Sequence, residues 1–100
     1  MNANTRTLLT IITESSLENR LIGDIEHLGA HGYTISDCRG KGAQGTRDAE
    51  WDYDSNIRVE VICSRETAAA ISSHLHKTYY KDFAMVMFSD DVAVLRPEKF

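Results

Sequence analysis

Apolar residues recur at helical intervals in two separate stretches of this chain, and this spacing limits the folds that the chain can adopt. The apolar positions are Leu17, Leu21, Ile22, Ile25 and Leu28 in the first stretch and Ala68, Ile71, Leu75 and Tyr79 in the second. Residues that recur every three or four positions lie on one face of a helix. We therefore expect two amphipathic helices, each with an apolar face that another element must cover.

Polar residues and glycines mark the expected helix ends. Ser15 and Glu18 have the spacing of a capping box, which predicts the start of the first helix. Gly29 and Gly32 then end that helix, because glycine favours the backbone conformation that follows a last turn. Ser64 occupies the corresponding N-cap position before the second helix.

Segments typical of strands surround the two helices. They are Thr7 to Thr13, Tyr33 to Arg39, Asn56 to Cys63, Phe83 to Phe88 and a short closing segment, Val92 to Arg96, which follows a turn at Ser89 to Asp91. The order β-α-β-β-α-β is that of the ferredoxin-like fold, in which two helices cover one face of an antiparallel sheet. We therefore predict one α+β domain over residues 1–100, with a ferredoxin-like fold and a short C-terminal strand.

The second face of the predicted sheet has no cover from its own chain. Its strands would present Leu, Ile, Val and Met side chains to water, and exposed apolar faces of this kind mark contacts between subunits. A chain of 100 residues also has a core that only just outweighs chain entropy. Both arguments predict an oligomer.

Composition excludes several classes of partner. The net charge is -4 and the pI about 5.5, which argues against nucleic acid, because that partner requires a positive surface. Cys38 and Cys63 are 25 residues apart without a CxxC motif, so we expect two reduced thiols. The apolar run LLTIIT near the N-terminus is too short for a signal peptide or a membrane span, and we expect a cytoplasmic protein.

The segment from about residue 40 to 55, between the second and third predicted strands, is too rich in glycine and charge to pack. Its first half reads RGKGAQGTR and its second half DAEWDYD. Glycines at alternate positions allow backbone N–H groups to point at an anion, and Lys41 and Arg47 would add charge-assisted hydrogen bonds to phosphate oxygens. The pattern matches neither a dinucleotide-binding nor a Walker sequence, so a solvated loop remains open at this point.

Other functions remain open from the residues alone. The acidic half of the loop, Asp48 to Asp54, could hold a divalent cation in a ferredoxin-like trimer that binds a different small ligand. A small acylphosphatase-like enzyme could use Arg47 and Asn56, but its phosphate cradle should follow the first strand, where ITESSLEN lacks glycine and arginine. An RNA-binding module would need exposed aromatic residues on NIRVEVIC and a positive surface, and the chain meets neither requirement.

Four segments together resemble the PII superfamily of trimeric signalling proteins, in particular its SbtB-type and carboxysome-associated PII-like branch. They are GAHGYTISDCRGKGAQGTR (29–47), SNIRVEVI (55–62), TYYKDFAMVMF (78–88) and VAVLRPEKF (92–100), with GYT followed by GKG the most specific. The resemblance covers nearly the whole chain. It implies a homotrimer without catalytic activity, in which the loop of residues 40–55 is the T-loop that contacts the target.

The resemblance also implies a site for adenine nucleotides between adjacent subunits. Tyr33 and Thr34 would approach the adenine, while Gly40, Lys41, Gly42 and Arg47 would hold phosphate at the base of the T-loop. Arg58 and Glu60 would lie nearby on the next strand. The neighbouring subunit would supply Phe83, Arg96 and Lys99. Bicarbonate would bind beside the nucleotide.

Two departures from the family refine this expectation. Nitrogen-sensing PII proteins carry a second phosphate loop, TGxxGDGK, where this chain reads YYKDFAMVMFSDD without glycine. This difference favours ADP, AMP or cyclic AMP over ATP. The chain also reads PEKF at its end, where many SbtB-type proteins have a CGPEGC redox tail. We expect a regulator of inorganic carbon uptake or carboxysome-linked CO2 fixation, with a membrane bicarbonate transporter or a carboxysome component as its target.

Overall fold

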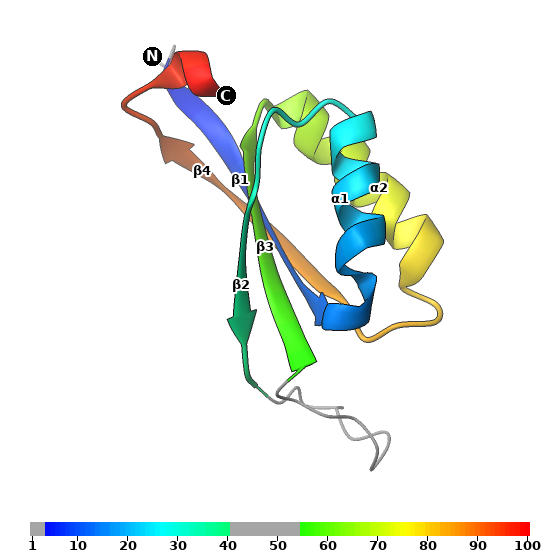
Figure 1. Ribbon diagram of the computed structural model, residues 1–100. Coiled ribbons are helices and arrows are strands. Elements are labelled where there is room, and N and C mark those ends of the chain that lie inside the picture. Colours follow the sequence, from blue (N-terminus) through cyan, green and yellow to red (C-terminus); the bar gives the residue numbers. More distant parts are fainter. Residues whose placement is uncertain (1–3, 41–54) are drawn as a thin grey trace.

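The computed structural model describes residues 4–40 and 55–100, and confirms the ferredoxin-like α+β fold (Figure 1). The elements, in order, are β1 (Thr5–Glu14), the 3-10 helix η1 (Ser15–Leu17), α1 (Glu18–His27), β2 (Thr34–Cys38), β3 (Asn56–Cys63), α2 (Arg65–Tyr79), β4 (Val86–Ala93) and the 3-10 helix η3 (Pro97–Lys99). The four strands form one sheet in the order β2-β3-β1-β4, and all three pairings are antiparallel. Figure 1 shows α1 and α2 on the same side of this sheet.

In the central strands β1 and β3, the alternation of residues determines which side chains face the helices. β3 has the predicted bounds, and its residues Ile57, Val59 and Val61 are buried toward the helices. β1 is longer than predicted because it pairs along its length with both β3 and β4, so the ladder continues beyond the apolar residues. β2 is one residue shorter than predicted at each end.

The prediction for the C-terminal strands was wrong. Residues 83–85 precede the strand, Ser89 to Asp91 form no turn, and no separate strand covers 92–96, because β4 runs without interruption from Val86 to Ala93. Each residue of β4 has a partner on β1, including Asp91 opposite Thr7. The Asp91 carboxylate lies 3.5 Å from the Thr7 hydroxyl and 3.2 Å from Arg65 Nη2. These contacts and the exposed edge position allow charged residues to remain in a strand.

The start of α1 also differs from the prediction. Ser15 opens η1 rather than capping a helix, and the N-cap of α1 is Leu17, which has no side-chain cap bond. The predicted end at Gly29 is confirmed, since Gly29 has φ 110° and its N–H donates to Glu26 at 3.1 Å. The Ala30 N–H donates to Ile25 at 3.0 Å, which completes a Schellman motif.

The second helix forms as predicted. Ser64 is its N-cap, and the Ser64 hydroxyl accepts a hydrogen bond from the Thr67 N–H at 3.1 Å. The four buried residues of α2 are those of the predicted stripe, Ala68, Ile71, Leu75 and Tyr79. With Leu21 and Ile25 of α1 they cover the sheet and make the core. Within the described residues, no helix combines the length and apolar character needed to cross a bilayer.

The face of the sheet opposite the helices, here called the open face, is divided into two lanes. The register places Ile12 of β1 opposite Val86 of β4 and Thr10 opposite Phe88, and both β4 side chains are 53% exposed. Leu8 lies opposite Asp90, where the apolar part of this face ends. On the other side, β2 and β3 present polar residues, namely Thr34, Ser36, Arg58 and Glu60. The sheet therefore carries an apolar lane along β1 and β4 and a polar lane along β2 and β3.

Polar contacts at Asp24 join the two helices. The Tyr79 hydroxyl of α2 donates a hydrogen bond to Asp24 Oδ2 of α1 at 2.6 Å, and His74 Nε2 lies 3.5 Å from Asp24 Oδ1. The pKa of Tyr79 is raised above its ordinary value of 10.0, first because burial disfavours the phenolate and then because Asp24 accepts the phenol proton in a hydrogen bond. Deprotonation of Tyr79 would therefore break the contact between α1 and α2.

Replacing Tyr79 by phenylalanine is expected to lower the free energy of unfolding at neutral pH by about 1.5–3 kcal/mol, the range for a hydrogen bond to a charged group. Because the folded state has the higher pKa, the stabilisation is complete below about pH 10 and is lost as pH rises through the folded-state pKa. Urea unfolding at several pH values measures both effects. Tyr80→Phe is the matched control, since Tyr80 is 36% exposed. Equal losses in both variants would contradict the prediction.

Candidate functional site

One end of the sheet gathers the base of the predicted T-loop, and we call it the loop end. Here β2 ends at Cys38 opposite Asn56, where β3 begins, and Asn56 also pairs with Glu14 at the end of β1. β4 begins nearby, since Val86 pairs with Ile12. In Figure 1 the connection from α2 to β4 lies at the same end.

Gly40 is the predicted phosphate-binding residue that the structure places at the loop end, two residues after β2. A Cβ atom built on Gly40 would meet no described atom within 4 Å. Packing within the subunit therefore does not require glycine there, and the backbone is open to a ligand. The other phosphate-binding candidates, Lys41, Gly42 and Arg47, lie outside the described residues, as does the acidic segment Asp48 to Asp54.

The polar lane holds three of the predicted contacts, and a fourth, Tyr33, directly precedes it. Arg58 Nε donates to Glu60 Oε2 at 3.3 Å, and the two side chains are 43% and 36% exposed. Thr34 at the start of β2 pairs with Glu60, and Tyr33 just before it is 38% exposed. Thr34 and Cys38 are about 13 Å apart along β2 at the usual strand rise. Tyr33 and Thr34 are thus separated along β2 from Gly40 at the loop end.

Phe83 lies in the α2–β4 connection at the loop end. Its ring packs edge-on against Tyr79, with 6.0 Å between the ring centroids, and it contacts the core cluster. Arg20 of α1 lies over both rings, 5.0 Å from the Tyr79 centroid and 6.0 Å from that of Phe83. Neither Arg20 nor Asp24 was predicted from the sequence, although opposite charges four residues apart on one helix face are a usable signal.

Arg96 and Lys99 lie at the opposite end of the sheet. They follow β4, where Ala93 pairs with Thr5, and the Val94 N–H donates to the Asn4 carbonyl at 2.8 Å. Arg6 Nη2 also donates to the Pro97 carbonyl at 3.1 Å, which holds the C-terminal segment beside β1. The eight residues of β4 span about 23 Å. One subunit therefore cannot bring these two cations to its own loop end.

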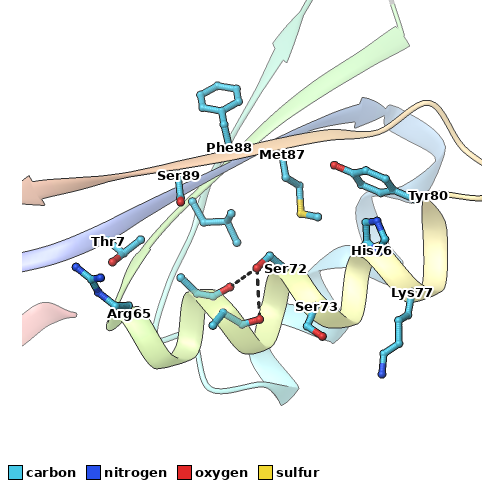
Figure 2. Close-up of a pocket in the computed structure, with 13 residues that line it drawn as sticks. Thr7, Arg65, Ser72, Ser73, His76, Lys77, Tyr80, Met87, Phe88 and Ser89 are labelled. Atoms are coloured by element: carbon cyan, nitrogen blue, oxygen red, sulfur yellow. Dashed lines mark hydrogen bonds between the residues drawn. The ribbon is translucent and has the colours of Figure 1, made fainter.

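A groove of about 760 Å³ runs between α2 and the edge strand β4, on the helix side of the sheet (Figure 2). Figure 2 shows Met87 of β4 pointing toward α2. Ser72 and His76 of α2, and Tyr80 directly after it, also line the groove. The groove is lined by none of the site residues that the sequence predicted. We therefore do not include it in the candidate site.

The remaining chemistry of the subunit is limited. Within residues 4–40 and 55–100, no three His, Cys, Asp or Glu side chains converge in the way that a metal ion requires. Cys63 is buried, and burial raises the pKa of its thiol because the thiolate is poorly solvated. This environment makes Cys63 a packing residue rather than a nucleophile.

Comparison with known structures finds similar proteins, of which two are described here by three structures. A "putative PII-like signaling protein" from Thermus thermophilus is 41% identical, with a TM-score of 0.81 over 96% of this chain and 95% of its own. CPII from Thiomonas intermedia, solved bound to ADP and bicarbonate, is 25% identical, with a TM-score of 0.81 over 96% and 94%. A second CPII structure, bound to ADP, AMP and acetate, shows the same fold at 23% identity, with a TM-score of 0.82 over 96% and 94%.

The family comparison agrees with these structures. The family described as Nitrogen regulatory protein P-II matches residues 6–99. That range includes the whole sheet except Thr5, both helices and the loop between β2 and β3. The match over residues 6–99, together with 41% identity over nearly the full length of the Thermus protein, shows that this chain belongs to the nitrogen regulatory protein P-II family.

Proposed function

We propose that this PII-like regulatory protein is a homotrimeric, non-catalytic cytoplasmic sensor that binds an adenine nucleotide in the clefts between adjacent subunits. ADP and AMP are the preferred ligands, with cyclic AMP as a further candidate. Gly40, Lys41, Gly42 and Arg47 would hold the phosphates at the loop end of one subunit. Tyr33 and Thr34 would approach the adenine.

The distribution of the basic residues over two ends of the subunit supports a shared site. Arg96 and Lys99 lie at the end of the sheet opposite Gly40, so they can reach a loop end only when it belongs to another copy. The apolar lane of the open face, where Val86 and Phe88 are 53% exposed, offers the surface on which copies can assemble. The site would be incomplete without a second subunit.

Arg58 and Glu60 are suited to the ribose or phosphate of the ligand. They already pair at 3.3 Å on a half-exposed face, so a ligand can replace one partner without uncovering a buried charge. Phe83 would contribute an aromatic surface near a loop end, and its position beside Tyr79 fixes its direction.

A role in inorganic carbon control extends this proposal. The CPII structure bound to ADP and bicarbonate shares this fold. If bicarbonate bound beside the nucleotide raises nucleotide affinity, the nucleotide must raise bicarbonate affinity by the same factor. The T-loop would then contact a membrane bicarbonate transporter or a carboxysome component. Nucleotide binding would shift the population of T-loop conformations that the target recognises.

Titration calorimetry with AMP, ADP, ATP and cyclic AMP, each with and without bicarbonate, tests the proposal. We expect binding of ADP or AMP near one per subunit, and a higher affinity when bicarbonate is present. Absence of heat with all four nucleotides would leave the fold intact and overturn the nucleotide function. Equal affinity with and without bicarbonate would overturn the link to inorganic carbon.

Charge reversal by Arg47→Glu is expected to abolish nucleotide binding, because a carboxylate would repel the phosphates that the arginine is proposed to hold. Sedimentation should still show a trimer. Lys77→Glu is the matched control, since Lys77 is exposed on α2 and belongs to none of the proposed contacts. Unchanged affinity in Arg47→Glu would show that the phosphate site is assigned to the wrong residue.

A further inference from the structure

The α2–β4 connection is held by local backbone hydrogen bonds. The N–H groups of Asp82 and Phe83 both donate to the Tyr79 carbonyl, at 3.1 and 3.0 Å, and the Met85 N–H donates to the Phe83 carbonyl at 3.0 Å. These bonds shape residues 79–85 but join them only to one another. Between its two ends, which α2 and β4 fix, the position of the connection depends on side-chain contacts, among them that of Met85 in the core.

Arg20 supplies such a contact from the other helix. Its guanidinium carbon lies 5.0 Å from the Tyr79 ring centroid and 6.0 Å from that of Phe83, within the range of cation–π attraction for both rings. The two rings meet edge-on, so one guanidinium can lie against both. A planar cation suits this position better than an ammonium group does.

Asp24 adds a second contact from α1, one helical turn after Arg20. It accepts the Tyr79 hydroxyl at 2.6 Å and lies 3.5 Å from His74, so the last turns of α2 are fixed to α1. Tyr79 itself is buried, with 2% of its surface exposed. Tyr79 is thus fixed by burial and by its hydrogen bond to Asp24, and Arg20 adds a contact between α1 and Phe83.

We infer that Arg20 is a positioning residue for the α2–β4 connection and that, through Phe83, it sets the affinity of the nucleotide site. The second part rests on the proposed function. A connection that spends only part of its time in the binding-competent position lowers the apparent affinity by that fraction. Arg20 would raise the competent fraction without touching the nucleotide.

Amide hydrogen exchange in the ligand-free protein tests the first part. Arg20→Met keeps the length of the side chain and removes the cation. We expect exchange at Asp82, Phe83 and Met85 to become about two- to fivefold faster, the effect of losing a partly exposed cation–π contact. Arg65→Met is the matched control, since it removes one charge from the other end of α2. Equal exchange in Arg20→Met and the wild type would overturn the inference.

Calorimetry with ADP tests the second part. Arg20→Met should bind about two- to fivefold more weakly than the wild type, and Arg20→Lys should recover part of the loss because it keeps a cation over the rings. In a double-mutant cycle with Phe83→Leu, the two losses should be less than additive if Arg20 acts through Phe83. Additive losses would assign Arg20 a direct electrostatic effect and overturn the positioning role.

The two proposals fail in different ways. If the wild type binds neither ADP nor AMP, the proposed function is wrong, and the exchange rates alone decide whether Arg20 positions the connection. If the wild type binds ADP and Arg20→Met binds it equally well, the proposed function stands and the effect of Arg20 on affinity is wrong.

Discussion

Replacing Phe88 by glutamate is expected to convert the proposed homotrimer into folded monomers. Phe88 lies in the apolar lane of the open face, opposite Thr10, and its neighbour on that lane is Val86. Assembly through this lane would bury three carboxylates without partners, each at a cost of several kcal/mol. Within one subunit Phe88 is 53% exposed, so the substitution should leave the fold nearly unchanged.

Sedimentation analysis measures the mass and circular dichroism measures the secondary structure of this variant. Ala70→Glu is a suitable control, because Ala70 is exposed on α2 and lies on the helix side of the molecule. The control should keep the mass of the wild type. If Phe88→Glu remains a trimer, the subunits assemble through a different surface.

Truncation of Ile71 to alanine is expected to lower the free energy of unfolding by about 2–5 kcal/mol. Ile71 is fully buried at the centre of the α2 stripe, among side chains of β1, β3 and α1 in the core cluster. The loss combines the transfer free energy of the removed carbon atoms with the cost of the cavity that they leave. Ile71→Val removes one methylene group and should cost about 0.5–1.5 kcal/mol.

Chemical denaturation at a fixed protein concentration measures this series, since assembly makes stability concentration-dependent. Thr78→Ala serves as the surface control, because Thr78 is exposed on the same helix, and it should change stability by less than about 0.5 kcal/mol. A loss below about 1 kcal/mol for Ile71→Ala would contradict the prediction and show that α2 can move to fill the cavity.

Local periodicity was sufficient to predict the elements that are amphipathic on their own. β3 and the buried stripe of α2 agree residue for residue, because strict alternation and a helical stripe each admit one orientation toward the core. The end of α1 was predictable for a similar reason, since Gly29 takes a positive φ that other residues rarely adopt.

The strand at the C-terminal end was not predictable from local chemistry. Ser89 to Asp91 have the composition of a turn, yet they pair with β1, which supplies a partner for every residue of β4. The contacts of Asp91 with Thr7 and Arg65 join residues far apart in sequence, and no local pattern reveals them. The prediction of a capping box at Ser15 was also wrong, because Ser15 begins the 3-10 helix η1.

The candidate site could be proposed only through family resemblance, and its residues stay a prediction. Spacing alone placed glycines and cations in one loop, but it could not show that Gly40 and Arg96 belong to opposite ends of the subunit. That separation depends on the antiparallel order of the sheet. The contact of Arg20 with Phe83 likewise depends on how α1 lies against α2.

If the nucleotide site is shared between subunits as proposed, the separation of Gly40 from Arg96 also links ligand binding to self-association. A nucleotide held between two copies binds the assembly and not the isolated subunit, so it must strengthen the assembly by the free energy of its own binding. Upon dilution, the trimer should persist to lower protein concentrations in saturating ADP than in buffer. Its apparent affinity for the nucleotide should fall as the subunits separate. The sensor would then respond to its own abundance in the cell as well as to the nucleotide.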